Sequence, residues 1–341
     1  GSIDPRGYPL LYTGQGLNDM DGVNCPWQYR IFDLIQNKQV AGWSGSDPAA
    51  PRKDWGAFDS SALVNAASDT LIEPAENGLV YKVKLNAKFD AAAKTVSVDP
   101  QLTRMEYRTP TSEKFGIESS AAAYRNLMYA ADNDGNLICW DANTMAVIWA
   151  RNVGDDTDAT ITLDQTPDGV FIYTGNEIDK RGAAGTNMIT NLRKINALTG
   201  EQVWQYDIPA LYDNGVNGGL LATPLLGTGE ISDMIIFNVA KTTSQSAGTM
   251  VALDKVTGKP IWTRTMKRYS WSSPVQITST TGKAYGIVTD SGGTMHLFDP
   301  NTGKDLSTLS LGKNTEASPA VYGNMIVVAS YARRIWGIKI S

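Results

Sequence analysis

The chain is poor in the residue types on which most catalytic and metal centres depend. Its 341 residues include two cysteines and one histidine. Cys25 and Cys139 lie far apart without a CxxC motif, so a disulfide framework or a thiolate zinc site has no support. The isolated His296 is predicted to fill a packing position in a strand. These shortages argue against multi-histidine metal sites and against Ser-His-Asp or Cys-His catalysis.

Positive charge and long apolar runs are also scarce. Lysine and arginine number 30 against 35 acids, which gives a formal net charge of −5, and no basic run occurs. Nucleic-acid binding is therefore not expected, because it needs a concentrated cationic surface. No apolar stretch approaches the roughly 18 residues of a membrane span. Residues 1–7 begin with Gly-Ser and are interpreted as a tag remnant or a closing segment, with any signal or anchor removed.

A repeat runs through the rest of the chain. Three segments align without a gap, and each has an alternating apolar run, then Asp or Asn, then Thr-Gly, then a second run: Arg193–Trp204, Val251–Trp262 and His296–Ser307. Ile138–Trp149 is a fourth copy, with Met145 in place of the glycine. Alternation followed by polar residues and glycine is typical of a β-hairpin.

A small hydroxyl residue, often followed by proline, precedes each hairpin. Ser273-Pro274, Ser318-Pro319 and Thr223-Pro224 are the clearest examples, and proline is tolerated at the first residue of a strand. One repeat then contains four antiparallel strands, which predicts a β-propeller blade. We expect an all-β, single-domain propeller over residues 8–341 with seven blades, six or eight being the alternatives. The predicted blades start near residues 8, 61, 120, 160, 223, 273 and 318.

The blocks GTMVALDKVTGKPIW and GTMHLFDPNTGK resemble the repeats of the PQQ-binding-like β-propeller family, the quinoprotein alcohol dehydrogenase-like superfamily. The resemblance is strong in the second half of the chain and diluted over residues 14–110. It implies a bacterial protein that is extracellular, at the cell surface or periplasmic. Family members include periplasmic dehydrogenases and non-enzymatic proteins, so the fold does not fix the function.

The resemblance to the dehydrogenases is incomplete. Those enzymes carry adjacent cysteines over the quinone and a bound Ca²⁺, whereas Cys25 and Cys139 are not adjacent. No cofactor is therefore expected, PQQ least of all, although calcium stays open. A non-catalytic protein is the favoured interpretation.

One position in each blade, two residues before the opening hydroxyl residue, is expected to face the mouth of a central channel. Carboxylates gathered there would attract cations, and aromatic rings would bind a sugar, an amine or a basic side chain. The alternative is that these residues are solvated turn residues. The candidate ligand-binding residues are Arg6, Asp59, Glu118, Asp158, Trp271 and Glu316 at this position, together with Tyr269 near Trp271.

Two weaker candidates lie in the diluted part of the repeat. Asp19, Asp21 and Asn24 resemble the first half of a calcium loop but lack its later glutamate, so a polar inter-strand loop is the alternative. Trp27 and Trp55 are candidate surface aromatics for a protein or carbohydrate ligand, with core packing as the alternative.

We therefore expect a binding or scaffold propeller that recognises a protein or a glycan through one face or the channel mouth. The alternatives are a PQQ- and Ca²⁺-dependent oxidoreductase with an atypical site and an architectural spacer within a longer surface protein.

Overall fold

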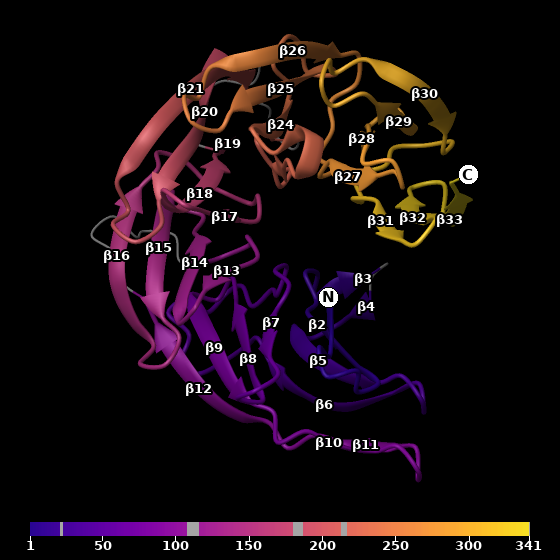
Figure 1. Ribbon diagram of the computed structural model, residues 1–341. Helices are drawn as coiled ribbons and strands as arrows, with labels where there is room; N and C mark the ends of the chain where they lie inside the picture. The colour runs from indigo at the N-terminus through magenta and orange to yellow at the C-terminus, as the bar shows by residue number, and fades with distance from the viewer. Residues whose placement is uncertain (21–22, 108–115, 180–186, 213–216, 341) are drawn as a thin grey trace. The chain divides into compact units, whose positions relative to one another are not determined.

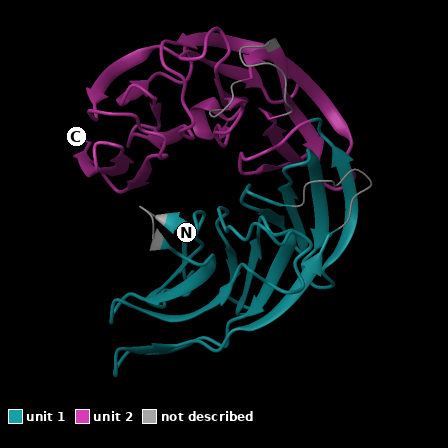
Figure 2. Cartoon of the chain, turned by 180° about the vertical axis from the view of Figure 1, so that it is seen from behind, with its two compact units in different colours: residues 1–154 teal, residues 155–341 magenta. Residues whose placement is uncertain are grey.

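The computed structural model describes residues 1–20, 23–107, 116–179, 187–212 and 217–340. The chain divides into two compact units, residues 1–154 and 155–341, which are described separately (Figure 2). Both units consist of antiparallel sheets. Within the described residues the single helix is the 3-10 turn η1 (Gly229–Ile231). No described helix therefore has the length and apolar character that crossing a bilayer requires.

Unit 1 contains three four-stranded sheets, which we call blades 1 to 3 (Figure 1). Blade 1 consists of β1 (Ser2–Ile3), β2 (Leu10–Thr13), β5 (Gln28–Asp33) and β6 (Lys38–Ser44). Blade 2 consists of β7 (Leu63–Asn65), β8 (Thr70–Pro74), β9 (Leu79–Lys84) and β12 (Gln101–Glu106). Blade 3 consists of β13 (Ala122–Tyr124), β14 (Leu127–Ala131), β15 (Asn136–Asp141) and β16 (Ala146–Asn152). Two small hairpins are added, β3 (Asp19–Met20) with β4 (Val23–Asn24) and β10 (Lys88–Asp90) with β11 (Thr95–Ser97).

Unit 2 contains blades 4 to 7 (Figure 1). Blade 4 consists of β17 (Thr162–Thr166), β18 (Gly169–Gly175), β20 (Asn187–Asn196) and β21 (Gln202–Leu211), and blade 5 of β23 (Leu225–Leu226), β24 (Met234–Ala240), β25 (Gly248–Asp254) and β26 (Pro260–Met266). Blade 6 consists of β27 (Val275–Thr278), β28 (Ala284–Thr289), β29 (Thr294–Phe298) and β30 (Asp305–Ser310). Blade 7 consists of β31 (Ala320–Tyr322), β32 (Met325–Ser330) and β33 (Arg334–Lys339). Blade 5 also includes β19 (Glu177–Ile178) and β22 (Gly218–Gly219).

The all-β propeller fold with seven blades is confirmed, and within the described residues blade 7 has three strands. The first strands of blades 2, 3, 4, 5, 6 and 7 each begin two residues after the predicted opening residue. Blade 1 differs from the prediction, because its first strand is β1 rather than a strand near Tyr8. Ser2 and Ile3 pair with Tyr12 and Leu11, so part of the predicted tag or closing segment is a strand of blade 1.

The two middle strands of blade 5 are buried on both faces. All seven residues of β24 are buried, as are the first six of β25. A sheet that is apolar on both faces must be covered on both, which explains why the hydrophobic clusters include side chains from neighbouring blades.

A tryptophan of one blade packs on the Thr-Gly turn of the next. The Trp262 indole N–H donates a 2.7 Å hydrogen bond to the carbonyl of Pro300, and a Cβ on Gly303 would lie 2.6 Å from the Trp262 ring. Trp204 repeats the arrangement with the carbonyl of Lys255 and with Gly258. Both glycines have φ near +70°. Glycine therefore recurs here because the turn needs a left-handed residue without a side chain.

Replacing Gly303 with alanine is expected to destabilise the protein more than replacing Gly282. Gly282 has φ +86°, and a Cβ added there would have no other atom within 4 Å, so G282A adds only backbone strain, about 1–2 kcal/mol. G303A adds overlap with Trp262, about 1–3 kcal/mol more. Urea unfolding of both variants measures the difference, and equal losses would contradict the packing role.

Candidate functional site

Hydrogen bonds from a backbone N–H to a side-chain hydroxyl join the opening residues of neighbouring blades. In unit 1 the N–H of Ser61 donates to the Ser120 hydroxyl at 2.8 Å. In unit 2 the N–H of Thr223 donates to the Ser273 hydroxyl at 3.0 Å, and Ser273 donates in turn to Ser318 at 2.9 Å. The small hydroxyl residue recurs because its side chain accepts this bond. Each candidate residue lies two positions before an opening residue, so these bonds hold the candidate residues of neighbouring blades on adjacent segments of the chain.

A second backbone bond places a partner beside each candidate position. In five blades, the residue that follows the second strand of the blade by one or two positions donates its N–H. The acceptor is the carbonyl oxygen of the residue two positions before that blade's candidate residue. The bonds run from Glu76 to Ala57 (3.1 Å), Asn133 to Gly116 (3.0 Å), Glu177 to Asp156 (2.9 Å), Ser291 to Tyr269 (2.9 Å) and Tyr331 to Asn314 (2.9 Å). Each candidate residue and this donor residue form what we call an opening–turn pair.

In unit 1 two opening–turn pairs bring three carboxylates together. Carboxylate oxygens of Asp59, Glu76 and Glu118 lie within 4.8 Å of one another, and we call these three residues the acidic cluster. The N–H of Ile117 donates to the carbonyl of Ala75 at 3.2 Å, which sets Glu118 of blade 3 beside Glu76 of blade 2. Asp59 is exposed, Glu118 is half-buried and Glu76 is only 3% exposed.

The acidic cluster is only partly balanced by its surroundings. Arg52 Nη1 lies 3.8 Å from Glu76 Oε2, and the Asn133 side-chain amide donates to Glu118 Oε1 at 2.7 Å. Glu76 Oε1 is buried and receives no hydrogen bond from any described residue. The three carboxylates of the acidic cluster therefore share one positive group among the described residues, the Arg52 guanidinium, which is close to the limit of about 4 Å for an ion pair.

The electrostatic consequence is a strong preference for neutral or cation-bound carboxyl groups. Burial, together with the charges of Glu118 and Asp59, raises the pKa of Glu76 to about 10. Burial also raises the pKa of Glu118, despite its hydrogen bonds and the charge of Arg52. The acidic cluster can thus be neutralised by a proton or by a cation.

The predicted surface aromatics lie next to this cluster. The rings of Trp27 and Trp55 contact each other with centroids 5.2 Å apart, and both side chains are half-buried. The Arg52 guanidinium lies 5.6 Å from the Trp55 ring centroid. Arg52 therefore connects the tryptophan pair to Glu76.

In blades 6 and 7 of unit 2 the opening positions carry Trp271 and Glu316, with further aromatic residues beside them. The rings of Tyr269 and Trp271 lie 5.7 Å apart. Glu316 accepts hydrogen bonds from the Tyr331 hydroxyl at 2.8 Å and from the Asn314 amide at 2.7 Å. The bond to Glu316 raises the pKa of Tyr331, whose side chain is 63% exposed. We call Tyr269, Trp271, Glu316 and Tyr331 the aromatic–acidic patch.

Arg6 is not at such a position, contrary to the sequence prediction. It lies in the turn after the first strand of blade 1, whereas Asp59 precedes the first strand of blade 2. Its guanidinium pairs with Asp4 at 2.6 Å and also with Asp69, at the far end of β7 from Asp59. The prediction placed blade 1 one strand too late.

The remaining candidates stay predictions. Asp158 is half-buried before β17, and the carbonyl of Asp156, two residues earlier, accepts the N–H of Glu177. Asp19 and Asn24 are cross-strand partners in the β3–β4 hairpin, while Asp21 lies outside the described residues.

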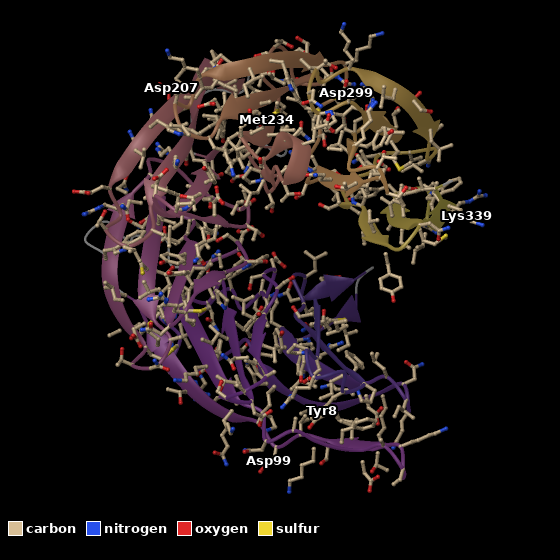
Figure 3. The ribbon with its side chains drawn as sticks, in the orientation of Figure 1. Tyr8, Asp99, Asp207, Met234, Asp299 and Lys339 are labelled. Carbon is tan, nitrogen blue, oxygen red and sulfur yellow. The ribbon has the colours of Figure 1, made fainter. Side chains whose placement is uncertain are left out.

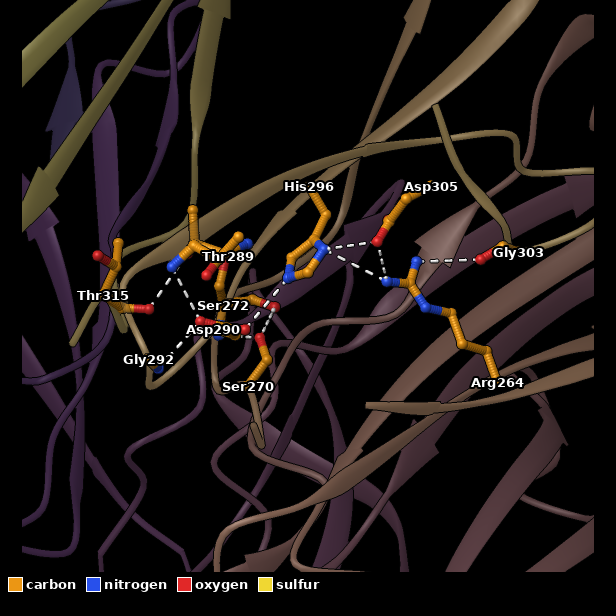
Figure 4. Close-up of polar contacts among 11 residues, drawn as sticks. Arg264, Ser270, Ser272, Thr289, Asp290, Gly292, His296, Gly303, Asp305 and Thr315 are labelled. Atoms are coloured by element: carbon orange, nitrogen blue, oxygen red, sulfur yellow. Dashed lines mark hydrogen bonds and ion pairs between the residues drawn. The ribbon is translucent and has the colours of Figure 1, made fainter. Parts of the chain in front are cut away.

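His296 belongs to a polar network as well as to a buried strand (Figure 4). Its Nε2 lies 3.1 Å from Asp290 Oδ2, and its Nδ1 lies 3.0 Å from Asp305 Oδ2. Asp305 also pairs with Arg264 at 2.7 Å, and Asp290 Oδ1 accepts two backbone N–H groups of its own turn. Burial lowers the pKa of His296, but the bonds to Asp290 and Asp305 outweigh it, so the net pKa is raised.

Sequence reasoning missed Glu76 and Tyr331. Both lie in the turn after a second strand, and the signal that could have found them is the alignment of Glu76-Asn77-Gly78 with Asn133-Asp134-Gly135. The opening position of each blade does not by itself reveal this second position.

Comparisons with known proteins support the fold and part of the family resemblance. Residues 246–341 match the family model described as outer membrane protein assembly factor BamB, which confirms the PQQ-like repeat in that part. The crystal structure of BamB from Moraxella catarrhalis is similar over 98% of this chain and 83% of that chain, with a TM-score of 0.60 and 16% identity. No curated protein matches the sequence.

Replacing Glu76 with glutamine is expected to stabilise the protein at pH 7 in a buffer containing a chelator. A carboxyl group whose folded pKa is raised opposes folding between its unfolded and folded pKa values, and pH 7 lies in that window. At pH 7 the buried carboxyl must therefore take up a proton on folding, whereas glutamine keeps the shape and is neutral in both states, so the variant gains roughly 1–3 kcal/mol. Urea unfolding checks this, and a loss of stability would contradict the electrostatic account.

The stability supplied by His296 is expected to decrease as pH rises. A raised folded pKa means that this contribution is complete below the unfolded value of about 6.5 and is lost as pH rises through the folded pKa. NMR titration of this single histidine should give a pKa above 6.5, and D305N should lower it. A wild-type pKa below 6.5 would show that burial dominates over the two aspartates.

Proposed function

We propose that the protein is a non-catalytic, protein-binding scaffold of a bacterial cell envelope, acting in the periplasm or at the cell surface. The observation that carries the proposal is the match of residues 246–341 to the BamB family model. BamB is named as an outer membrane protein assembly factor, and the fold likeness to a BamB structure extends over nearly the whole chain.

The aromatic–acidic patch is the proposed contact surface in unit 2. All four of its residues lie within the matched range. Trp271 is half-buried, and its indole nitrogen has no hydrogen-bond partner among the described residues. Tyr331 offers an exposed ring beside the Glu316 carboxylate. Rings of this kind supply contact area at low entropic cost, and the carboxylate favours a partner segment that carries lysine or arginine.

A photo-crosslinking amino acid placed at residue 331 tests the proposal in cells that make the full-length protein. Residue 322 is the matched control, because Tyr322 is 91% exposed and ends strand β31, where it pairs with the first residue of β32, whereas Tyr331 follows the last residue of β32. We expect a discrete adduct with one partner protein from residue 331 and none from residue 322. W271A and E316Q should each weaken that adduct severalfold, because they remove a ring and a charge from the contact.

Three results would overturn the proposal. Equal crosslinking from both positions would show contact without a defined surface. Retention of the purified protein on a glycan, abolished by W271A, would make the ligand a carbohydrate. Dye reduction by the protein loaded with PQQ and Ca²⁺ would favour the oxidoreductase, although free Cys25 and Cys139 lack the adjacent disulfide that the resemblance implies for such enzymes.

A further inference from the structure

We propose that Asp59, Glu76 and Glu118 bind one divalent cation, with calcium as the preferred ion. The proposal concerns unit 1 alone and does not depend on the aromatic–acidic patch or on a protein partner. The calcium loop considered from the sequence, at Asp19, Asp21 and Asn24, is a separate location.

The spacing of the carboxylates fits a cation with oxygen ligands. Their oxygens lie within 4.8 Å of one another. Calcium binds oxygen at about 2.3–2.6 Å, so ligands on opposite sides of the ion are separated by roughly 4.6–5.2 Å. One ion can therefore touch all three carboxylates without a change of backbone.

Glu76 supplies a second and independent indication of a ligand. The residue is 97% buried (3% exposed), and its Oε1 accepts no hydrogen bond from any described residue. A buried carboxylate oxygen without a donor is costly, and a bound cation would remove that cost. Because Glu76 Oε1 is buried, a small ion can reach it. A bulky ligand would contact only the exposed Asp59.

The charges point to a divalent ion. Three ionised carboxylates carry three negative charges, and Arg52 offers one positive charge at 3.8 Å from a single oxygen of Glu76. A divalent ion neutralises the remaining two. The backbone bonds from Glu76 to Ala57 and from Ile117 to Ala75 fix the segments that carry the ligands, so the site exists before the ion binds.

Terbium luminescence tests the site directly. Tb³⁺ substitutes for Ca²⁺ at oxygen sites and emits when a nearby tryptophan is excited. Trp55 is a suitable sensitiser, because Arg52 contacts both its ring and Glu76. We expect saturable emission from the wild-type protein, displacement of the terbium by Ca²⁺, and a rise in thermal midpoint with added Ca²⁺.

Three variants decide the outcome. E76Q and D59N should each reduce Tb³⁺ affinity at least tenfold, and the exposed Asp59 makes D59N the safer variant for folding. D99N is the matched control, because Asp99, labelled in Figure 3, is an exposed carboxylate of the same unit and is not one of the three clustered residues. It should leave the affinity unchanged. W55F should lower the emission without changing the Ca²⁺ concentration that displaces the ion.

The proposal fails if wild-type protein shows no saturable emission, or if D59N, E76Q and D99N weaken binding equally. In the first case the cluster is neutralised by protons, and in the second the ion is held by general surface charge. Displacement by Mg²⁺ at lower concentration than Ca²⁺ would reject calcium as the preferred ion. None of these results bears on crosslinking at residue 331, so the two proposals fail separately.

Discussion

The arrangement of the candidate sites depends on one repeated hydrogen bond, from the N–H of one opening residue to the hydroxyl of the next. It is present from Ser61 to Ser120 in unit 1 and from Ser273 to Ser318 in unit 2. An N–H that begins a buried sheet needs an acceptor, and the neighbouring blade supplies it. The bond fixes the separation of adjacent opening segments. Between blades 5 and 6, which the bond from Thr223 to Ser273 joins, the packing of Trp262 on the turn at Gly303 adds a second contact.

Because these contacts use backbone groups and small hydroxyls, the side chains beside them can differ from blade to blade. Unit 1 has carboxylates at its opening–turn pairs, whereas blades 6 and 7 in unit 2 have aromatic residues and Glu316. One scaffold can therefore hold an ion-binding cluster and a protein-binding patch without a change of fold. This separation of frame from side-chain chemistry is the reason why the likeness to BamB shows the fold but leaves the ligands to be argued residue by residue.

The sequence predicted the blades well because alternation and Thr-Gly turns are local signals. It also predicted that Asp59 and Glu118 occupy equivalent positions. It could not predict that Glu76 joins them, because that contact needs the bonds from Glu76 to Ala57 and from Ile117 to Ala75, which join segments far apart in the sequence. The error at Arg6 has a similar origin. Strand β1 has two residues, too few for alternation to be detected, so the first blade was started one strand late. His296 was predicted as a packing residue, and its bond to Asp305 depends on cross-strand register.

The central claim is that the backbone frame of unit 1 holds three carboxylates around one cation. Anomalous diffraction from a crystal of the protein grown with Tb³⁺ tests it most directly. The account predicts a strong peak within about 2.6 Å of an oxygen from each of Asp59, Glu76 and Glu118. A crystal structure with no peak there, and with the Glu118 carboxylate turned away from Glu76, would contradict the account.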